Sequence, residues 1–290
     1  MVCDICPREC GVDRENEVGF CGMPDSFVIA RAALHYWEEP FLSGKNGSGT
    51  VFFSGCNLRC AYCQNYRISA ERFGKEVSDK HLMKIFDSLI EQGAHNINLV
   101  TPTHYARRLE KVLREYKSPV PVIYNCGGYE KVETLRRLEG LIDIYLPDIK
   151  YISSERAEKY SRAPDYFDFA SEAVKEMIRQ TGDAEFDENG LMKKGTVIRH
   201  LVLPKNTNQS IQIIEWMKEN IPKDTYISMM SQFTPVIHCD RFSELNRKIT
   251  QREYDKVVSF LLDSGFENCL IQTGEAAKES FIPDFNLTGI

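Results

Sequence analysis

From Thr50 onward, short apolar runs alternate with amphipathic stretches along the chain. The runs are rich in β-branched or aromatic residues, as buried parallel strands are, and cover residues 50–54, 96–100, 120–125, 142–146, 196–203, 225–230 and 268–272. Helical periodicity lies between them, at residues 78–93, 103–116, 130–139, 208–220 and 250–264. In the first helix Ser78 is a suitable N-cap and Gly93 ends the last turn. Such an alternation, repeated about six times, predicts a parallel β/α barrel or an open doubly wound sheet.

Two segments depart from this alternation. Residues 151–195 are too long for one helix and predict two helices, followed by a polar excursion from Gly182 to Gly195. That excursion either borders a substrate site or is a surface elaboration. Residues 1–47 are instead punctuated by Cys, Gly and Pro. We therefore expect a Cys-rich metal-binding cap at 1–47, a barrel at 48–275 and a C-terminal tail at 276–290.

Composition narrows the function classes. The 290 residues are 42% hydrophobic and carry a net charge of −6, which argues against nucleic acid as a partner. No run approaches ~18 consecutive apolar residues, so we expect no membrane span. Ten cysteines indicate either a disulfide framework or metal ligation in a reducing compartment. The first of them is Cys3, which leaves no room for a cleavable leader, so we favour metal binding in the cytoplasm.

Three cysteines follow the first apolar run directly. Cys56, Cys60 and Cys63 have the spacing C-x3-C-x2-C, with Tyr62 before the last one. Three thiolates can ligate three irons of a [4Fe-4S] cubane and leave the fourth iron open, whereas electron-transfer ferredoxins use four. S-adenosylmethionine (SAM) can chelate such an open iron through its amino and carboxylate groups. The alternatives are a zinc site, which normally has four closed ligands, or coincidence.

With this triplet, the chain resembles the radical SAM superfamily, whose members carry it after the first strand of a partial (β/α)6 barrel. The resemblance covers nearly all of residues 48–275. It implies reductive cleavage of SAM to a 5′-deoxyadenosyl radical, with electrons from a flavodoxin- or ferredoxin-type donor. Further segments resemble proteins related to pyruvate formate-lyase activating enzyme, a branch of largely unassigned activity: NLVTPTHY, YLPDIK, IRHLVLP and FIPDF.

The resemblance also implies roles for single residues. Tyr62 would lie against the adenine of SAM. Asp148 and Lys150 resemble the D-x-K at the end of the fourth strand, near the methionine moiety, and side chains two apart leave a strand on the same face. Arg199 resembles an arginine that contacts SAM or substrate. Because neighbours on a strand alternate, His200 would then face away.

Two positions differ from the usual family pattern. Members commonly hold the SAM amino group with Gly-Gly-Glu after the second strand, where this chain has Thr101 and Thr103, whose hydroxyls can accept hydrogen bonds. Glycyl-radical activases have Asp-Thr near a cation site after the third strand, where Asn125 and Cys126 stand here. We predict Asn125 as a SAM contact. Cys126 is either a hydrogen-atom donor or lining residue, or a buried inert thiol.

A second group of cysteines stands at the start of the chain. Cys3, Cys6, Cys10 and Cys21 have the spacing C-x2-C-x3-C-x10-C. Four thiolates close a zinc site or a cubane equally well, and the spacing does not choose between them. The segment is too short to bury a core of its own, so a metal would be its main source of order. The alternative is four free thiols.

These observations predict a radical SAM enzyme, of an activating-enzyme-like oxidoreductase kind, with an unidentified substrate. Hydrogen abstraction from a glycine of a protein partner is one hypothesis, and modification of a peptide or small molecule is the other. The alternative from a different class is a non-catalytic iron–sulfur or zinc module that binds partners.

Overall fold

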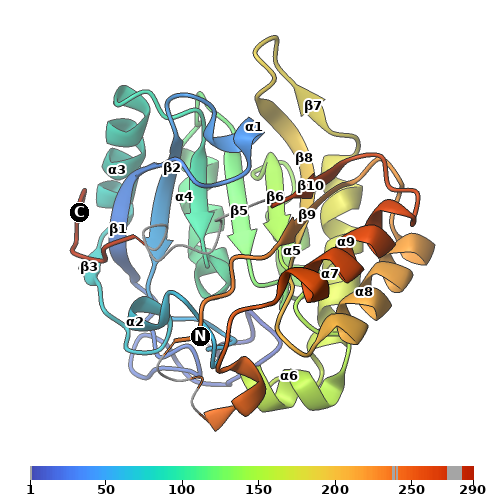
Figure 1. Cartoon of the computed structure of the whole chain (residues 1–290). Helices are drawn as coiled ribbons and strands as arrows, with labels where there is room; N and C mark the ends of the chain where they lie inside the picture. Colours follow the sequence, from blue (N-terminus) through green and yellow to red (C-terminus); the bar gives the residue numbers. More distant parts are fainter. Residues whose placement is uncertain (1, 237–238, 240, 273–282) are drawn as a thin grey trace.

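The seven apolar runs form parallel strands of one sheet (Figure 1) in the computed structural model, which describes residues 2–236, 239, 241–272 and 283–290. Their order from one edge is β10-β9-β8-β6-β5-β4-β2, with every neighbouring pair parallel. The bounds are β2 (Ser48–Phe53), β4 (Ile97–Val100), β5 (Val122–Cys126), β6 (Ile144–Pro147), β8 (Met192–Leu201), β9 (Tyr226–Met230) and β10 (Cys269–Ile271).

Three further strands are antiparallel additions that the sequence analysis did not predict. Strand β1 (Phe27–His35) pairs with β2 on one side and with β3 (Lys75–Val77) on the other, while β7 (Glu185–Phe186) pairs with β8. The polar excursion after Gly182 is thus a hairpin. Strand β1 lies inside the segment expected to be a cap. Its sequence FVIARAALH lacks strict alternation, because residues on both faces of the strand are buried or half-buried.

Helices between the strands cover one face of the sheet (Figure 1). Ser78 caps α3 by accepting a hydrogen bond from the His81 N–H (3.2 Å), as its place before an amphipathic stretch predicts. The longer helices are α3 (Asp79–Glu91), α4 (Ala106–Glu115), α7 (Tyr166–Thr181), α8 (Thr207–Asn220) and α9 (Gln251–Leu262). The shorter ones are α1 (Pro40–Ser43), α2 (Tyr66–Ser69), η1 (Thr103–Tyr105), α5 (Val132–Arg137), α6 (Ser154–Ser161) and η3 (Ser243–Leu245).

The sheet is curved but not closed, since its path among the described residues ends at β10 on one side and β3 on the other. The fold is therefore α/β with a mostly parallel, open sheet, in agreement with the predicted partial barrel. The arrowheads of β5 and β6 point toward the part of the molecule where α2, α6 and the N-terminal segment gather (Figure 1). Chemistry in folds of this kind lies at the carboxyl ends of the strands.

The N-terminal segment is fastened to the barrel through two arginines. Arg14 is 4% exposed and donates hydrogen bonds to the carbonyls of Met23 (3.3 Å), Pro24 and His104. Arg8 donates to the carbonyls of Asn57 (2.8 Å), Ser161 and Arg162. A guanidinium presents several donors in a fixed plane, so one side chain can satisfy carbonyls from separate loops. The segment therefore lies against the loop that carries the cysteine triplet.

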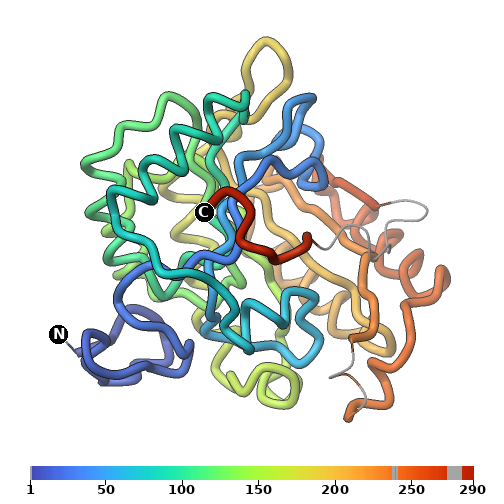
Figure 2. The backbone as a smooth tube through the Cα atoms, turned by 90° about the vertical axis from the view of Figure 1, so that its left-hand side faces the viewer, coloured from blue at the N-terminus to red at the C-terminus, as the bar shows by residue number. Residues whose placement is uncertain are grey.

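The last residues return to the first strand. Thr288 accepts a hydrogen bond from the Ala32 N–H (2.9 Å), and Phe285 packs against Phe52. Figure 2 shows this red segment crossing the blue strands. The boundary expected at residue 275 lies outside the described residues. No helix in the described part of the chain is long and apolar enough to span a membrane.

The contacts of Arg14 generate a stability prediction. Arg14→Ala removes three charge-assisted hydrogen bonds and leaves buried carbonyls without donors, so we expect the free energy of unfolding to fall by about 3 kcal/mol or more. Urea denaturation followed by circular dichroism measures it. Arg252→Ala, at an exposed position of α9, is the control and should change stability by less than about 0.5 kcal/mol. Equal effects of the two substitutions would contradict the fastening role of Arg14.

Candidate functional site

A tight turn after β2 aims the cysteine triplet at the carboxyl ends of the strands. Gly55 has φ +84°, and a Cβ there would lie 2.3 Å from the Met23 side chain and 2.9 Å from the Cys21 carbonyl oxygen. Only glycine fits this backbone conformation and this close approach. The turn therefore brings Cys56 away from the strand while holding the triplet loop against the N-terminal segment.

Each of the three sulfurs accepts at least one hydrogen bond from the protein. The donors are the Leu58 N–H to Cys56 (3.3 Å), the Ser161 hydroxyl to Cys60 (3.0 Å) and the Ser69 hydroxyl to Cys63 (3.3 Å). Hydrogen bonds to the sulfurs stabilise thiolate character and tune the potential of an iron–sulfur cluster. Donors from three separate segments thus converge on the triplet.

The triplet has the chemistry that a cluster needs. Burial and the neighbouring Cys60 and Cys63 raise the pKa of Cys56 to about 12, and burial and Cys60 also raise the pKa of Cys63. Cations bound among such thiols would stabilise their deprotonated forms. Within the described residues, no three Cys, His, Asp or Glu side chains are grouped to hold one metal ion. A cubane binds each thiolate to a different iron, so its ligands need not meet at one point.

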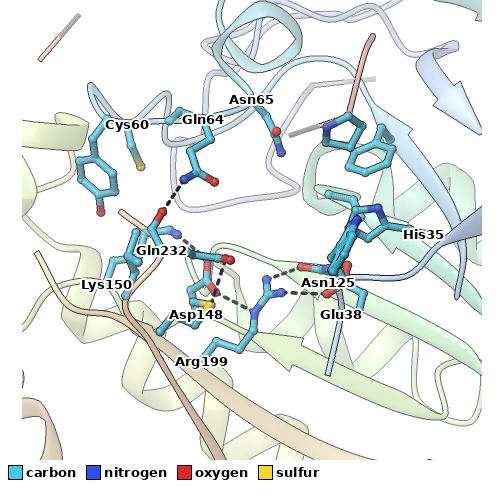
Figure 3. A pocket seen from close by; sticks show the side chains of 18 residues that line it. His35, Glu38, Cys60, Gln64, Asn65, Asn125, Asp148, Lys150, Arg199 and Gln232 are labelled. Carbon is cyan, nitrogen blue, oxygen red and sulfur yellow. Dashed lines mark hydrogen bonds and ion pairs between the residues drawn. The ribbon is translucent and has the colours of Figure 1, made fainter. Parts of the chain in front are cut away.

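A cavity of about 240 Å³ adjoins the triplet (Figure 3). Cys60 lies on one side of it, and Asp148 and Arg199 lie on the opposite side. Cys63 and Lys150 also line this cavity. Apolar side chains complete the wall: Phe52, Tyr62, Val100, Leu201 and Met230. A cavity with apolar walls and a few convergent polar groups is the usual form of a cofactor or substrate site.

Arg199 is the centre of the polar side of this cavity. Its guanidinium donates to Asp148 (Nε to Oδ1, 3.0 Å), to Asn125 (Nη2 to Oδ1, 2.6 Å) and to Glu38 (Nη1 to Oε2, 3.4 Å). Lys150 donates to the other carboxylate oxygen of Asp148. The backbone reinforces the arrangement, because the Ile149 N–H donates to the Arg199 carbonyl (2.9 Å). One buried cation thus joins residues from β5, β8, the end of β6 and the segment after β1.

The charges in this group alter one another's pKa values. Burial alone would raise the pKa of Asp148, but the adjacent Lys150 and Arg199 charges hold it below its usual value. Burial raises the pKa of Glu38 despite the opposing effect of Arg199. Asp148 is therefore ionised at neutral pH and forms a true ion pair with both cations.

His200 points to the other side of β8, as the alternation of strand side chains predicts. Its ring nitrogens contact the Ile149 carbonyl (Nδ1, 2.6 Å) and the Ser210 hydroxyl (Nε2, 2.8 Å), and it is 1% exposed. Burial lowers its pKa to about 4, so the ring is neutral near pH 7. Arg199 faces the cavity and His200 faces helix α8.

Three predicted site residues are not brought into the cavity. Cys126 follows Asn125 on β5 and therefore faces the opposite side, where it is 3% exposed. The Thr103 hydroxyl donates to the buried carboxylate of Glu130 (2.5 Å), which places it behind the sheet. Thr101 has φ +59° and does not line the cavity either. At the end of β4, Val100 is the lining residue instead.

Several lining residues escaped the sequence analysis because they lie outside the predicted strands and the motifs that it singled out. Glu38 stands just after β1 in a run, WEEP, whose two acids follow an apolar stretch. These two adjacent acids are the one sequence signal that could have indicated Glu38 as a site residue. Gln64 and Gln232 also line the cavity and are joined by a hydrogen bond from the Gln64 amide to the Gln232 carbonyl (2.8 Å). Ser69 and Ser161 carry no sequence signal.

The N-terminal cysteines also gather together. Burial is the main cause that raises the pKa of Cys6, to about 12, and the pKa of Cys21, and the charge of Cys3 adds to both. Cys10 accepts a hydrogen bond from the Phe20 N–H (3.2 Å) and also raises the pKa of Cys21. Three of these four thiols are buried, and the neighbouring thiols influence one another's pKa, but no three of them are grouped around a single metal ion in the described residues. A metal site at these cysteines stays a prediction.

The sequence matches one protein-family model and is similar to one curated protein. The family model of the radical SAM superfamily matches residues 50–217. The chain is 30% identical over 266 residues to the uncharacterized protein MJ0674 of Methanocaldococcus jannaschii, and the match covers 88% of this chain and 73% of that protein. The matched region contains the triplet and the strands that carry Asp148 and Arg199.

Solved structures agree with the fold. Methylornithine synthase (PylB) has a TM-score of 0.51 at 14% identity, covering 80% of this chain and 70% of that chain. The FeFe-hydrogenase maturase HydG from Carboxydothermus hydrogenoformans has a TM-score of 0.51 at 14% identity, covering 80% and 56% respectively. The chain spans about half the length of other solved structures that it matches, 47% in one case. At this identity the likeness concerns the fold alone.

Proposed function

Because the chain belongs to the radical SAM superfamily, we propose that it binds a [4Fe-4S] cluster and SAM at the cavity beside the triplet and generates a substrate radical there. One observation carries the proposal. Cys60 and Cys63 line the same cavity as the buried ionic group of Asp148, Lys150 and Arg199. Thiolates for a cluster and charged groups for an amino acid moiety thus face each other across one space.

Each residue has a defined task in this proposal. Cys56, Cys60 and Cys63 would hold three irons of the cluster, and the chemistry that the bound cluster would supply is the electron for reductive cleavage of SAM. Asp148, Lys150, Arg199 and Asn125 orient the charged end of SAM. The buried aromatic ring of Tyr62 packs beside the adenine. Apolar walls keep water from the reacting atoms.

The finer assignment is an activating-enzyme-like oxidoreductase of the cytoplasm, supplied with electrons by a flavodoxin- or ferredoxin-type protein. Its substrate is a protein glycine, a peptide or a small molecule. A non-catalytic iron–sulfur module is not favoured, because it would not need the buried ionic group opposite the triplet. We also propose the division into a metal-binding cap, a barrel and a C-terminal tail, with β1 joining the barrel sheet.

The triplet is tested by removing its ligands singly. Cys56→Ala, Cys60→Ala and Cys63→Ala should each abolish 5′-deoxyadenosine formation, because a cluster with two thiolates cannot present an open iron in the same way. Anaerobic reconstitution with dithionite and SAM, followed by chromatography of the products, measures this. Cys269→Ala, away from the cavity, is the control and should retain activity. Full SAM cleavage by any triplet variant would refute the assignment.

The N-terminal group is tested by metal analysis. The combined replacement of Cys3, Cys6, Cys10 and Cys21 by Ala should remove a second metal, as cluster iron or as zinc, while the SAM-dependent electron paramagnetic resonance signal of the first cluster remains. The physical reason is that the two donor sets share no cysteine. If the wild type never holds more than one cluster and no zinc, the second site does not exist.

The orientation of the β8 side chains, with Arg199 toward the cavity and His200 away from it, gives the third test of the proposed function. Arg199→Ala or Asp148→Ala leaves a buried charge without its partner, which commonly costs ~2–5 kcal/mol, so SAM affinity should fall roughly thirtyfold or more. His200→Ala should weaken SAM binding much less, because its ring faces helix α8. Equilibrium binding to the reconstituted, unreduced protein measures the affinity, and the cluster absorbance should persist. If His200→Ala lost SAM affinity and Arg199→Ala kept it, the assignment of Arg199 to the cavity face of β8 would be wrong.

A further inference from the structure

A second cavity of about 250 Å³ adjoins the first. The two share Trp37, Glu38, Arg199, Met230 and Gln232 as lining residues. The second cavity extends toward β9 and β10, where the described sheet ends and is not closed. Its apolar wall is formed by Trp37, Pro40, Met230, Leu270 and Ile271, and its polar wall by Glu38, Glu39, Arg199, Ser228, Gln232 and Gln272.

Glu39 lines this second cavity and is only 9% exposed. Its Oε2 atom is buried and has no hydrogen-bond partner among the described residues. A buried polar atom without a partner costs free energy, and for a carboxylate the cost is large. The arrangement is understandable if a ligand supplies the missing donor when the cavity is filled.

The neighbouring cation does not supply that donor in the described structure. The hydrogen bonds of the Arg199 guanidinium go to Asp148, Glu38 and Asn125. Lys150 is paired with Asp148. The two cavities thus contain three carboxylates and two cations, and Glu39 is the carboxylate without an ion pair among the described residues. The second cavity therefore holds a buried carboxyl group, Glu39, that a bound cation would favour in its ionised form.

We propose that the second cavity binds the substrate through an ammonium group, which pairs with Glu39 while an aliphatic stem lies along Trp37 and Met230. This inference rests on the proposed function, because it places the substrate beside the SAM site. An ammonium carries three donors and a full positive charge, so it satisfies the free oxygen and balances the excess carboxylate. The apolar wall favours a hydrocarbon stem over a second charged group.

Glu39 is well placed to hold its orientation before a ligand arrives. It precedes α1, and its backbone carbonyl accepts hydrogen bonds from the N–H groups of Leu42 (2.8 Å) and Ser43 (3.0 Å). Burial raises the pKa of its carboxyl group, while the nearby Arg199 and the Ser228 hydroxyl oppose that increase. The carboxylate is therefore a fixed acceptor on a folded turn, and a bound cation would favour its ionised form.

The test uses n-butylamine as the probe and 1-butanol as its neutral equivalent of the same length. Both are titrated into the reconstituted, SAM-loaded, unreduced protein by calorimetry or ligand-observed nuclear magnetic resonance. We expect butylamine to bind and 1-butanol not to compete with it. Glu39→Gln, which keeps the size of the side chain but removes its charge, should weaken butylamine binding roughly tenfold or more. Glu219→Gln, at an exposed position of α8, is the matched control and should bind like the wild type.

Three results would overturn the inference. The first two are equal binding of butylamine and 1-butanol, and unchanged butylamine affinity in Glu39→Gln. The third is that butylamine binds to the reconstituted protein without SAM and is displaced when SAM is added, which would assign Glu39 to the SAM site. If Glu39→Gln does not fold, the comparison of amine and alcohol on the wild type decides. SAM cleavage is measured separately after reduction. Amine binding without SAM cleavage would refute the proposed function and leave the ammonium site standing.

Discussion

The site depends on one buried cation, Arg199, which ties together parts of the chain that are far apart in sequence. A guanidinium can be kept away from water only if its donors are satisfied and its charge is balanced. Asp148, Glu38 and Asn125 meet both conditions from three directions. The same constraint fixes the ends of three strands and the turn after β1 relative to one another. A rigid polar wall therefore exists before any ligand binds.

The wall of the cavity that carries the cysteine triplet is positioned by contacts of the backbone. The close approach of Gly55 to Met23 and Cys21 and the Arg8 contact with the Asn57 carbonyl hold the N-terminal segment against the triplet loop. Arg14 joins the segment to His104 of η1. This makes the segment part of the site's support, whatever metal its cysteines bind. Ser161 illustrates the coupling, since its hydroxyl donates to Cys60 while its carbonyl accepts from Arg8. The thiol environment and the docking of the segment are thus linked through one residue.

Acidic side chains and their ion pairs are distributed unevenly over the two joined cavities. Next to the triplet, Asp148 is paired with both Lys150 and Arg199. Farther along, Glu38 takes the third contact of Arg199, and Glu39 has no ion pair in the described part of the chain. A cationic ligand would be attracted to the second cavity more than to the first. This division gives a physical basis for two different molecules to occupy adjoining spaces.

The sequence by itself determined the strand–helix alternation, the triplet, the carboxylate–lysine pair and the opposite facing of Arg199 and His200, because each follows from local periodicity or close spacing. It did not indicate β1, whose burial on both sides removes the alternating pattern, nor Glu38, Glu39, Ser69 and Ser161. It also placed Cys126, Thr101 and Thr103 in the site, where the pleat and the backbone turn them away. Only tertiary structure decided these points, because they depend on which distant segments meet at the cavity.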